Sequence, residues 1–243
     1  MINTFLLTGL LASVSLLYAT AGQAGGTAFI AVMAFAAFPA AEMRPTALLL
    51  NVVAAGYATS QLHQNGALDQ KALWPLTLPS MAAAFVGGLL VLNGREYFEL
   101  TGLLLIAAAV LMIFKREADS VETGSVMVFP AALAGAASGF LSGLTGVGGG
   151  VFLTPLIIAL GWASPKRAAA LSPPFILCNS VVGLLGVLIA GQRLTSNMPL
   201  YAVGALVGAV LGSAIARRGM SQRATRYVLA IILLFAGLRL LLR

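Results

Sequence analysis

Apolar blocks and short polar segments alternate along the whole chain. Ten apolar blocks cover residues 4–20, 27–39, 46–62, 74–93, 98–114, 127–144, 151–163, 168–190, 199–216 and 225–242. A hydrophilic stretch from Lys115 to Ser125 separates the first five blocks from the last five. Because about 20 apolar residues cross the hydrocarbon core of a bilayer, the pattern predicts an all-α polytopic membrane protein.

The two sets of blocks repeat each other at a constant offset of 124 residues. The identical pairs include Gly22 and Gly146, Gly25 and Gly149, Gly26 and Gly150, Pro75 and Pro199, Val86 and Val210, Gly88 and Gly212, and Thr101 and Thr225. A glycine cluster and a proline shared in one register indicate an internal duplication. We therefore expect a first transmembrane repeat (residues 1–114), a polar linker (115–126) and a second transmembrane repeat (127–243).

The N-terminal block has some features of a cleavable signal peptide, because small residues follow it. No Lys or Arg precedes the block, however, and an equivalent block recurs at residues 130–144. Cleavage would remove part of one repeat, so we expect the segment to be retained.

Each half contains a glycine-rich break inside apolar sequence. The first glycine break is residues 22–26 (Gly-Gln-Ala-Gly-Gly), and the second is residues 146–150 (Gly-Val-Gly-Gly-Gly). Glycine is a poor helix former, and unpaired backbone in hydrocarbon costs several kcal/mol per group. We therefore expect both breaks to lie against protein or a ligand-holding cavity rather than against lipid.

The blocks that flank each break are short for a complete membrane span. They form either one broken span, which gives four crossings per half and parallel repeats, or a re-entrant hairpin, which gives three crossings and inverted repeats. Five complete spans per half would have the same parity as the hairpin. With this odd parity nine Lys and Arg residues fall on one side and five on the other, against eight and six for even parity. The positive-inside rule therefore favours inverted repeats with both termini outside.

Composition excludes several classes of function. With 60% hydrophobic and 9% charged residues, the chain has too little polar surface for a soluble globule. The net charge of +7 comes from short clusters between apolar blocks, which is typical of membrane-flanking residues and not of nucleic-acid binding. The single cysteine, Cys178, permits no intrachain disulfide.

Titratable groups are missing from the centres of the blocks. All seven carboxylates lie at block ends or in the linker, and the one histidine, His63, lies where a block meets a loop. Cation transport and carboxylate-based proton coupling are therefore disfavoured. The chain contains neither a His-Glu-x-x-His motif nor a Gly-x-Ser-x-Gly motif, so we expect no enzyme activity, no cofactor and no metal.

Neutral polar residues gather near the two breaks. Helices that begin at about Thr27 and Val151 would direct unpaired N–H groups and positive dipole ends into the protein, an arrangement that suits an oxyanion. The candidate substrate-binding residues are Gly22, Gln23, Gly25, Gly26, Thr27, Asn51, Thr145, Gly146, Gly148, Gly149, Gly150, Thr154, Ser172 and Asn179.

Structural roles stay open for the same residues. The glycines also suit close helix packing, the hydroxyls suit bonds to their own helices, and Asn51 and Asn179 suit interhelical hydrogen bonds. Arg44, Lys166 and Arg167 would attract anions to a mouth, although membrane-interface anchoring is the more common role of such residues.

The stretch from Gly139 to Pro155, GFLSGLTGVGGGVFLTP, resembles the signature of the TauE/SafE sulfite exporter family. Members of that family have two such glycine segments in duplicated halves. The first half departs from the pattern, because Ala24 replaces one glycine and Ala31 stands at the counterpart of Pro155. The resemblance adds Pro155 to the candidate site, and Ser172 looks like a remnant of the family's small polar segment.

The resemblance implies transport of sulfite or a small organosulfonate, usually outward across the bacterial inner membrane. The expected mechanism is alternating access around a site formed by the two breaks. An anion channel of similar architecture, a carrier for an unrelated solute and a non-transporting membrane subunit are the alternatives. The expected partners are a small anionic substrate and the lipid bilayer, without nucleic acid, and a homo-oligomer is left open.

Overall fold

A computed structural model of the chain describes residues 3–20, 25–114, 128–216 and 222–242. These residues form ten helices and no strand. The helices are α1 (Thr4–Thr20), α2 (Gly26–Phe35), α3 (Ala40–Gln64), α4 (Gln70–Leu89), α5 (Gly94–Phe114), α6 (Val128–Thr145), α7 (Gly150–Ala159), α8 (Pro165–Ile189), α9 (Met198–Ala216) and α10 (Gln222–Leu241). Each predicted block corresponds to one of them, and the all-α prediction is confirmed.

The largest boundary difference is at α3, which begins at Ala40 although the predicted block begins at residue 46. Its first turns contain Glu42 and Arg44, two charged residues that an apolar pattern excludes. The preceding helix, α2, ends at Phe35 because Ala37 adopts a positive φ of 55° and Pro39 follows it.

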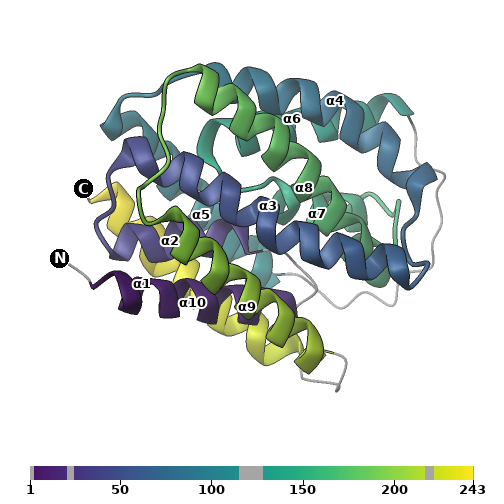
Figure 1. Ribbon diagram of the computed structural model, residues 1–243. Coiled ribbons are helices and arrows are strands. Elements are labelled where there is room, and N and C mark those ends of the chain that lie inside the picture. The colour runs from purple at the N-terminus through teal and green to yellow at the C-terminus, as the bar shows by residue number, and fades with distance from the viewer. Residues whose placement is uncertain (1–2, 21–24, 115–127, 217–221, 243) are drawn as a thin grey trace.

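Five described helices are long and apolar enough to cross a membrane, namely α4, α5, α6, α8 and α9. The central helix α3 is not among them, and it contains the buried polar residues Arg44, Thr46 and Asn51. α3 and α8 lie against each other in the middle of the bundle, as Figure 1 shows. Polar residues are tolerated on α3 because it is covered by protein.

The two halves are interleaved. α4 of the first half packs on α6 and α8 of the second, while α9 of the second half packs on α1 and α3 of the first. α3 and α8 run antiparallel, since Gly56 lies near Leu177 and Gly183 near Leu48. α5 and α10 are also antiparallel, because Gly102 of α5 contacts both Gly237 and Leu241 of α10, and Gly237 in turn contacts Ile106.

The bundle has two opposite ends, which we call the Tyr97 end and the Asp69 end after a residue that lies at each. The Tyr97 end contains the starts of α1, α3, α5 and α9 and the ends of α4 and α10, so the first and last described helices begin and finish together there (Figure 1). The Asp69 end contains the starts of α4 and α8 and the ends of α1, α3 and α9.

The two short helices, α2 and α7, each run back toward the end of the bundle at which the preceding helix, α1 or α6, begins. Phe38, after α2, has its ring centroid 6.3 Å from that of Tyr201 at the start of α9. Trp162 and Ala163, after α7, share an apolar cluster with Ala72 at the start of α4. α1 therefore begins and α2 finishes at the Tyr97 end, whereas α6 begins and α7 finishes at the Asp69 end.

Rows of glycine bring helices from different halves into backbone contact. Gly135, Gly139 and Gly143 on α6 lie so close to α4 that an added Cβ would stand 2.0 to 2.1 Å from the carbonyl oxygens of Leu76, Ser80 and Ala84. Gly204, Gly208 and Gly212 on α9 approach α1 in the same way. Small residues at four-residue spacing are a common device for packing membrane helices, where no hydrophobic effect drives association.

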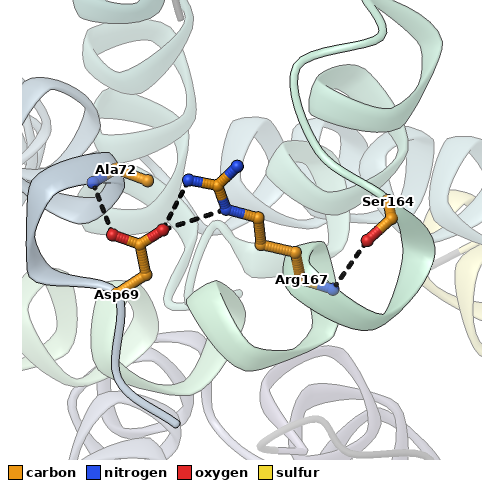
Figure 2. Close-up of polar contacts among 4 residues, drawn as sticks. All are labelled: Asp69, Ala72, Ser164 and Arg167. Carbon is orange, nitrogen blue, oxygen red and sulfur yellow. Dashed lines mark hydrogen bonds and ion pairs between the residues drawn. The ribbon is translucent and has the colours of Figure 1, made fainter. Parts of the chain in front are cut away.

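A polar contact joins the halves at the Asp69 end (Figure 2). Asp69 accepts a hydrogen bond from the backbone N–H of Ala72 at 3.1 Å, which caps α4, and another from Nε of Arg167 at 2.9 Å. Ser164 caps α8 by accepting from the Arg167 backbone N–H at 3.4 Å. The Ala72 N–H and then the Arg167 guanidinium hold the pKa of Asp69 below its usual value.

Replacing Gly139 by alanine should lower the melting temperature of the detergent-purified protein by several degrees. The added methyl group would lie 2.1 Å from the Ser80 carbonyl oxygen, and overpacking of this kind costs about 1–3 kcal/mol. Gly9→Ala is the matched control, because no atom lies within 4 Å of its added methyl group. Equal melting temperatures for the two variants would contradict the packing described for α4 and α6.

Replacing Asp69 by asparagine keeps a good helix cap but removes the charge that faces Arg167. A carboxyl whose pKa is lowered by folding stabilises the protein above its unfolded pKa of about 3.9, and this contribution disappears as the pH falls through the folded pKa. We expect a melting temperature about 1–3 °C below that of the wild type at pH 7, and a smaller difference below about pH 4.

Glu99→Gln serves as the control for Asp69→Asn, because the Arg95–Glu99 pair is much more exposed and its loss should not change the melting temperature. A difference between wild type and Asp69→Asn that persists unchanged at pH 3 would contradict the role given to the Asp69 charge.

Candidate functional site

The start of α2 and the second glycine break meet in the interior of the bundle. Gly26 approaches the break so closely that an added Cβ would lie 2.0 Å from the Val147 carbonyl oxygen. Asn51 of α3 lies between them and donates from Nδ2 to the Gly146 carbonyl oxygen at 3.1 Å. The structure therefore brings together residues of both halves that the sequence analysis selected separately.

The second glycine break is a turn that requires glycine. Gly146, Gly148 and Gly149 have φ values of 84°, 89° and 72°, which side chains rarely adopt. Gly149 is the N-cap of α7, and its left-handed conformation turns the chain back after α6. The glycines of the second break therefore allow the chain to reverse direction, whereas the evenly spaced glycines of α6 and α9 allow close helix packing.

Four buried polar side-chain atoms around the second break have no hydrogen-bond partner among the described residues. They are Asn51 Oδ1, Ser142 Oγ, Thr154 Oγ1 and Ser172 Oγ, and all four residues are at most 1% exposed. We call these four residues the break polar cluster. Buried polar groups in proteins are nearly always paired, so a group of unpaired ones is typical of a place where a ligand or water binds.

The break polar cluster surrounds the N-terminus of α7. Ser172 Oγ lies 2.6 Å from the position of an added Cβ on Gly150, and Cβ of Ser142 lies 3.3 Å from that of Gly149. Thr154 follows one turn later on α7. In the first turn of α7 the N–H groups of Gly150 and Phe152 already donate to the carbonyls of Gly148 and Gly149. The helix N-terminus still has a partial positive charge of about half an elementary unit. Together with hydroxyl groups it suits a small anion.

Two other candidate residues hold the breaks in place. Thr27 of α2 shares a hydrogen bond with the hydroxyl of Tyr18 on α1. Thr145 donates from Oγ1 to the Leu141 carbonyl at 2.6 Å, and its own carbonyl accepts from the Tyr97 hydroxyl at 3.0 Å. Both hydroxyls are therefore occupied within the protein, which matches the structural role left open for them.

Comparison with known proteins identifies the family. The family model described as "Sulfite exporter TauE/SafE" matches residues 5–240. The chain belongs to this family. It is an integral membrane protein, consistent with its five helices that are long and apolar enough to span a bilayer.

Relatives carry transporter names. The "Probable membrane transporter protein y4hK" of Sinorhizobium fredii is 32% identical over 232 residues, which is 94% of this chain and 94% of the relative. The "Probable membrane transporter protein MJ0441" of Methanocaldococcus jannaschii is 33% identical over 129 residues, 52% of this chain and 48% of the relative. No solved structure matches the chain.

The remaining candidate residues lie in different settings. Gly22 and Gln23 fall outside the described residues, and Gly25 is the N-cap of α2. Pro155 follows Thr154 on α7. Asn179 is at the contact of α8 with α4, where its Oδ1 accepts from the Ser80 hydroxyl at 2.8 Å. Its observed contact is thus the interhelical one.

The burial of Arg44 was not expected from the sequence. Its expected common role was anchoring at the membrane interface, but the side chain is 1% exposed and is enclosed by the ends of α4 and α8 and the start of α5. The apolar pattern does not reveal this, because it places the residue between two blocks and outside any helix. One sequence signal could have indicated this burial. Arg44 and Asn51 are seven residues apart, which places both on one face of a continuous helix.

Replacing Ser172 by alanine should leave the melting temperature unchanged or raise it, because its hydroxyl is buried without a partner among the described residues. Ser80→Ala is the matched comparison, since Ser80 is equally buried but donates to Asn179. We expect a loss of about 2–4 °C for Ser80→Ala in thermal unfolding of the detergent-purified protein. An equal loss for Ser172→Ala would mean that its hydroxyl is paired.

Proposed function

We propose that this protein is a secondary transporter that moves sulfite, a small organosulfonate or a related sulfur oxyanion outward across the cell inner membrane. The single observation that carries the proposal is the break polar cluster at the N-terminus of α7. Family membership supports transport of this class of substrate.

The chemistry of the cluster favours an anion over a cation. Its possible donors are three hydroxyl groups and the N-terminus of a helix, and it contains no carboxylate. The amide of Asn51 already donates to the Gly146 carbonyl and leaves only an acceptor, Oδ1, unpaired. No group of Asp, Glu, His or Cys among the described residues is arranged to hold a metal ion. Hydroxyl and backbone N–H groups donate to the oxygens of an oxyanion, and the helix dipole adds a favourable field.

The arrangement of the two halves supports alternating access. In an inverted repeat, equivalent helices of the two halves run in opposite directions. α3 and α8 are equivalent at the offset of 124 residues and contact each other antiparallel, as do α5 and α10. The pairs α1–α2 and α6–α7 begin at opposite ends of the bundle. We infer inverted repeats over residues 1–114 and 127–243, with the linker 115–126 outside the described residues.

Outward movement requires no coupling ion. Lys71 and Arg167 flank helix starts at the Asp69 end, which agrees with a cytoplasmic Asp69 end by the positive-inside rule. One elementary charge crossing 100 mV is worth about 2.3 kcal/mol. An inside-negative potential of that size therefore supports an outward gradient of roughly fiftyfold for a monovalent anion.

Purified protein in liposomes should carry sulfite in a saturable way, with efflux accelerated by an inside-negative potential. Thr154→Val should reduce the maximal rate at least tenfold, because the variant keeps the shape of the side chain and removes a donor from the site. Thr8→Val is the matched control and should transport normally, since the Thr8 hydroxyl only donates to the Thr4 carbonyl at 2.8 Å.

Three results of this assay would count against the proposal. Flux that rises linearly with sulfite concentration at rates far above carrier turnover would indicate a channel. Flux of a neutral or cationic solute that sulfite does not inhibit would indicate another substrate class. Equal rates for Thr154→Val and wild type would remove the break polar cluster from the site.

A further inference from the structure

Arg44 is a buried cation without a carboxylate partner among the described residues. Its Nη1 donates to the Leu90 carbonyl at 2.7 Å and its Nη2 to the Gly87 carbonyl at 3.1 Å, with a further hydrogen bond to the Gly88 carbonyl. The two ion pairs found in the described part of the chain involve other arginines. Within that part, the charge of Arg44 is therefore balanced only by neutral carbonyl groups.

The carbonyl groups at the end of α4 balance only part of this charge. The C-terminus of a helix corresponds to about half a negative elementary charge. A buried charge is normally paired, because removing it from water is strongly unfavourable. No group of full opposite charge among the described residues completes this balance. The Nε–H group of Arg44 also has no acceptor among the described residues.

Arg44 is one of the residues that line a cavity of about 210 Å³. Its walls are Ala40, Ala41, Arg44, Val91, Leu92, Gly94, Tyr97 and Gln192. Since a water molecule takes up about 30 Å³ in the liquid, the cavity holds a small oxyanion together with a few water molecules. Oε1 of Gln192 is also buried without a partner in the described structure, and as an acceptor it suits a water molecule of the cavity rather than the anion itself.

Tyr97 connects this cavity to the second glycine break. Its ring lines the cavity, and its hydroxyl donates to the carbonyl of Thr145, the last residue of α6 before the break. Arg44 touches the break from the other side, because its carbonyl oxygen is 3.0 Å from the position of an added Cβ on Gly146. A single layer of residues therefore separates the Arg44 cavity from the break.

We propose that Arg44 and its cavity form a second anion-binding site, which takes the oxyanion between the break polar cluster and the Tyr97 end. This inference rests on the proposed function. A guanidinium group donates to oxyanion oxygens with charge-assisted hydrogen bonds. The second half has no equivalent, because Ala168 stands at the offset of 124 residues from Arg44.

The test compares sulfite transport and sulfite-induced thermal stabilisation in wild type, Arg44→Gln and Arg44→Lys. We expect Arg44→Gln to raise the KM for sulfite ten- to a hundredfold, about 1.4–2.8 kcal/mol, with the maximal rate within threefold of wild type. Thermal stabilisation by sulfite should weaken in parallel. Arg44→Lys keeps the charge without the fork of donors, so its KM should be intermediate.

Arg44→Gln leaves carbonyl groups at the end of α4 unpaired and could therefore prevent folding. A second variant keeps the test valid in that case. Ala41 is exposed and lines the cavity, so Ala41→Phe fills the cavity while Arg44 is intact. It should raise the KM as Arg44→Gln does. Ala107→Phe, at an exposed position on α5 outside the cavity, is the control and should transport normally.

The outcomes separate this inference from the proposed function. Sulfite transport by wild type with an unchanged KM in Ala41→Phe and Arg44→Gln would overturn the second site and leave the proposed function intact. Sulfite binding that these variants lose, in a wild type that transports no sulfite, would support the site and overturn the proposed function. A wild type that neither binds nor transports sulfite would overturn both.

Discussion

The structure depends on the requirement that a peptide group inside a bilayer be paired or shielded from lipid. The second glycine break interrupts helical pairing, so protein must cover it. The residues from Gly25 to Ala34 and from Ser142 to Val151 are buried, and Asn51 supplies a hydrogen bond to the carbonyl of Gly146. This requirement explains why α3 is polar and lies at the centre of the bundle with α8.

Glycine meets two different physical demands in this chain. On α6 and α9 it recurs every four residues in ordinary helix and allows backbone contact with a helix of the other half. At the second break it adopts positive φ and reverses the chain. The first use joins the halves and the second builds the candidate site, so each half supplies a covering helix for the break of the other.

The helices and their order were predictable because hydropathy is a local property. The meeting of Gly26 with Val147 followed from the duplication, which placed both breaks at equivalent depths. The burial of Arg44 was not predictable from blocks, since its partners are carbonyl groups at the end of α4, more than forty residues away. The contact of Asn179 with Ser80 depends in the same way on which helices become neighbours, and apolar periodicity does not specify this.

The two halves have matching orders of helices but different fixed charges. Each half has a short helix that starts inside the bundle, whereas a buried guanidinium occurs among the described residues only at Arg44, with Ala168 at the equivalent position. An anion site at one end of a carrier changes the affinity on that face alone. It does not set the direction of net transport, which follows from the concentration gradient and the membrane potential. In the proposed carrier, detailed balance requires that tighter binding at the Tyr97 end be offset by the equilibrium between the two conformations. An anion site at Arg44 would then affect how often such a carrier opens to each side as well as what it binds.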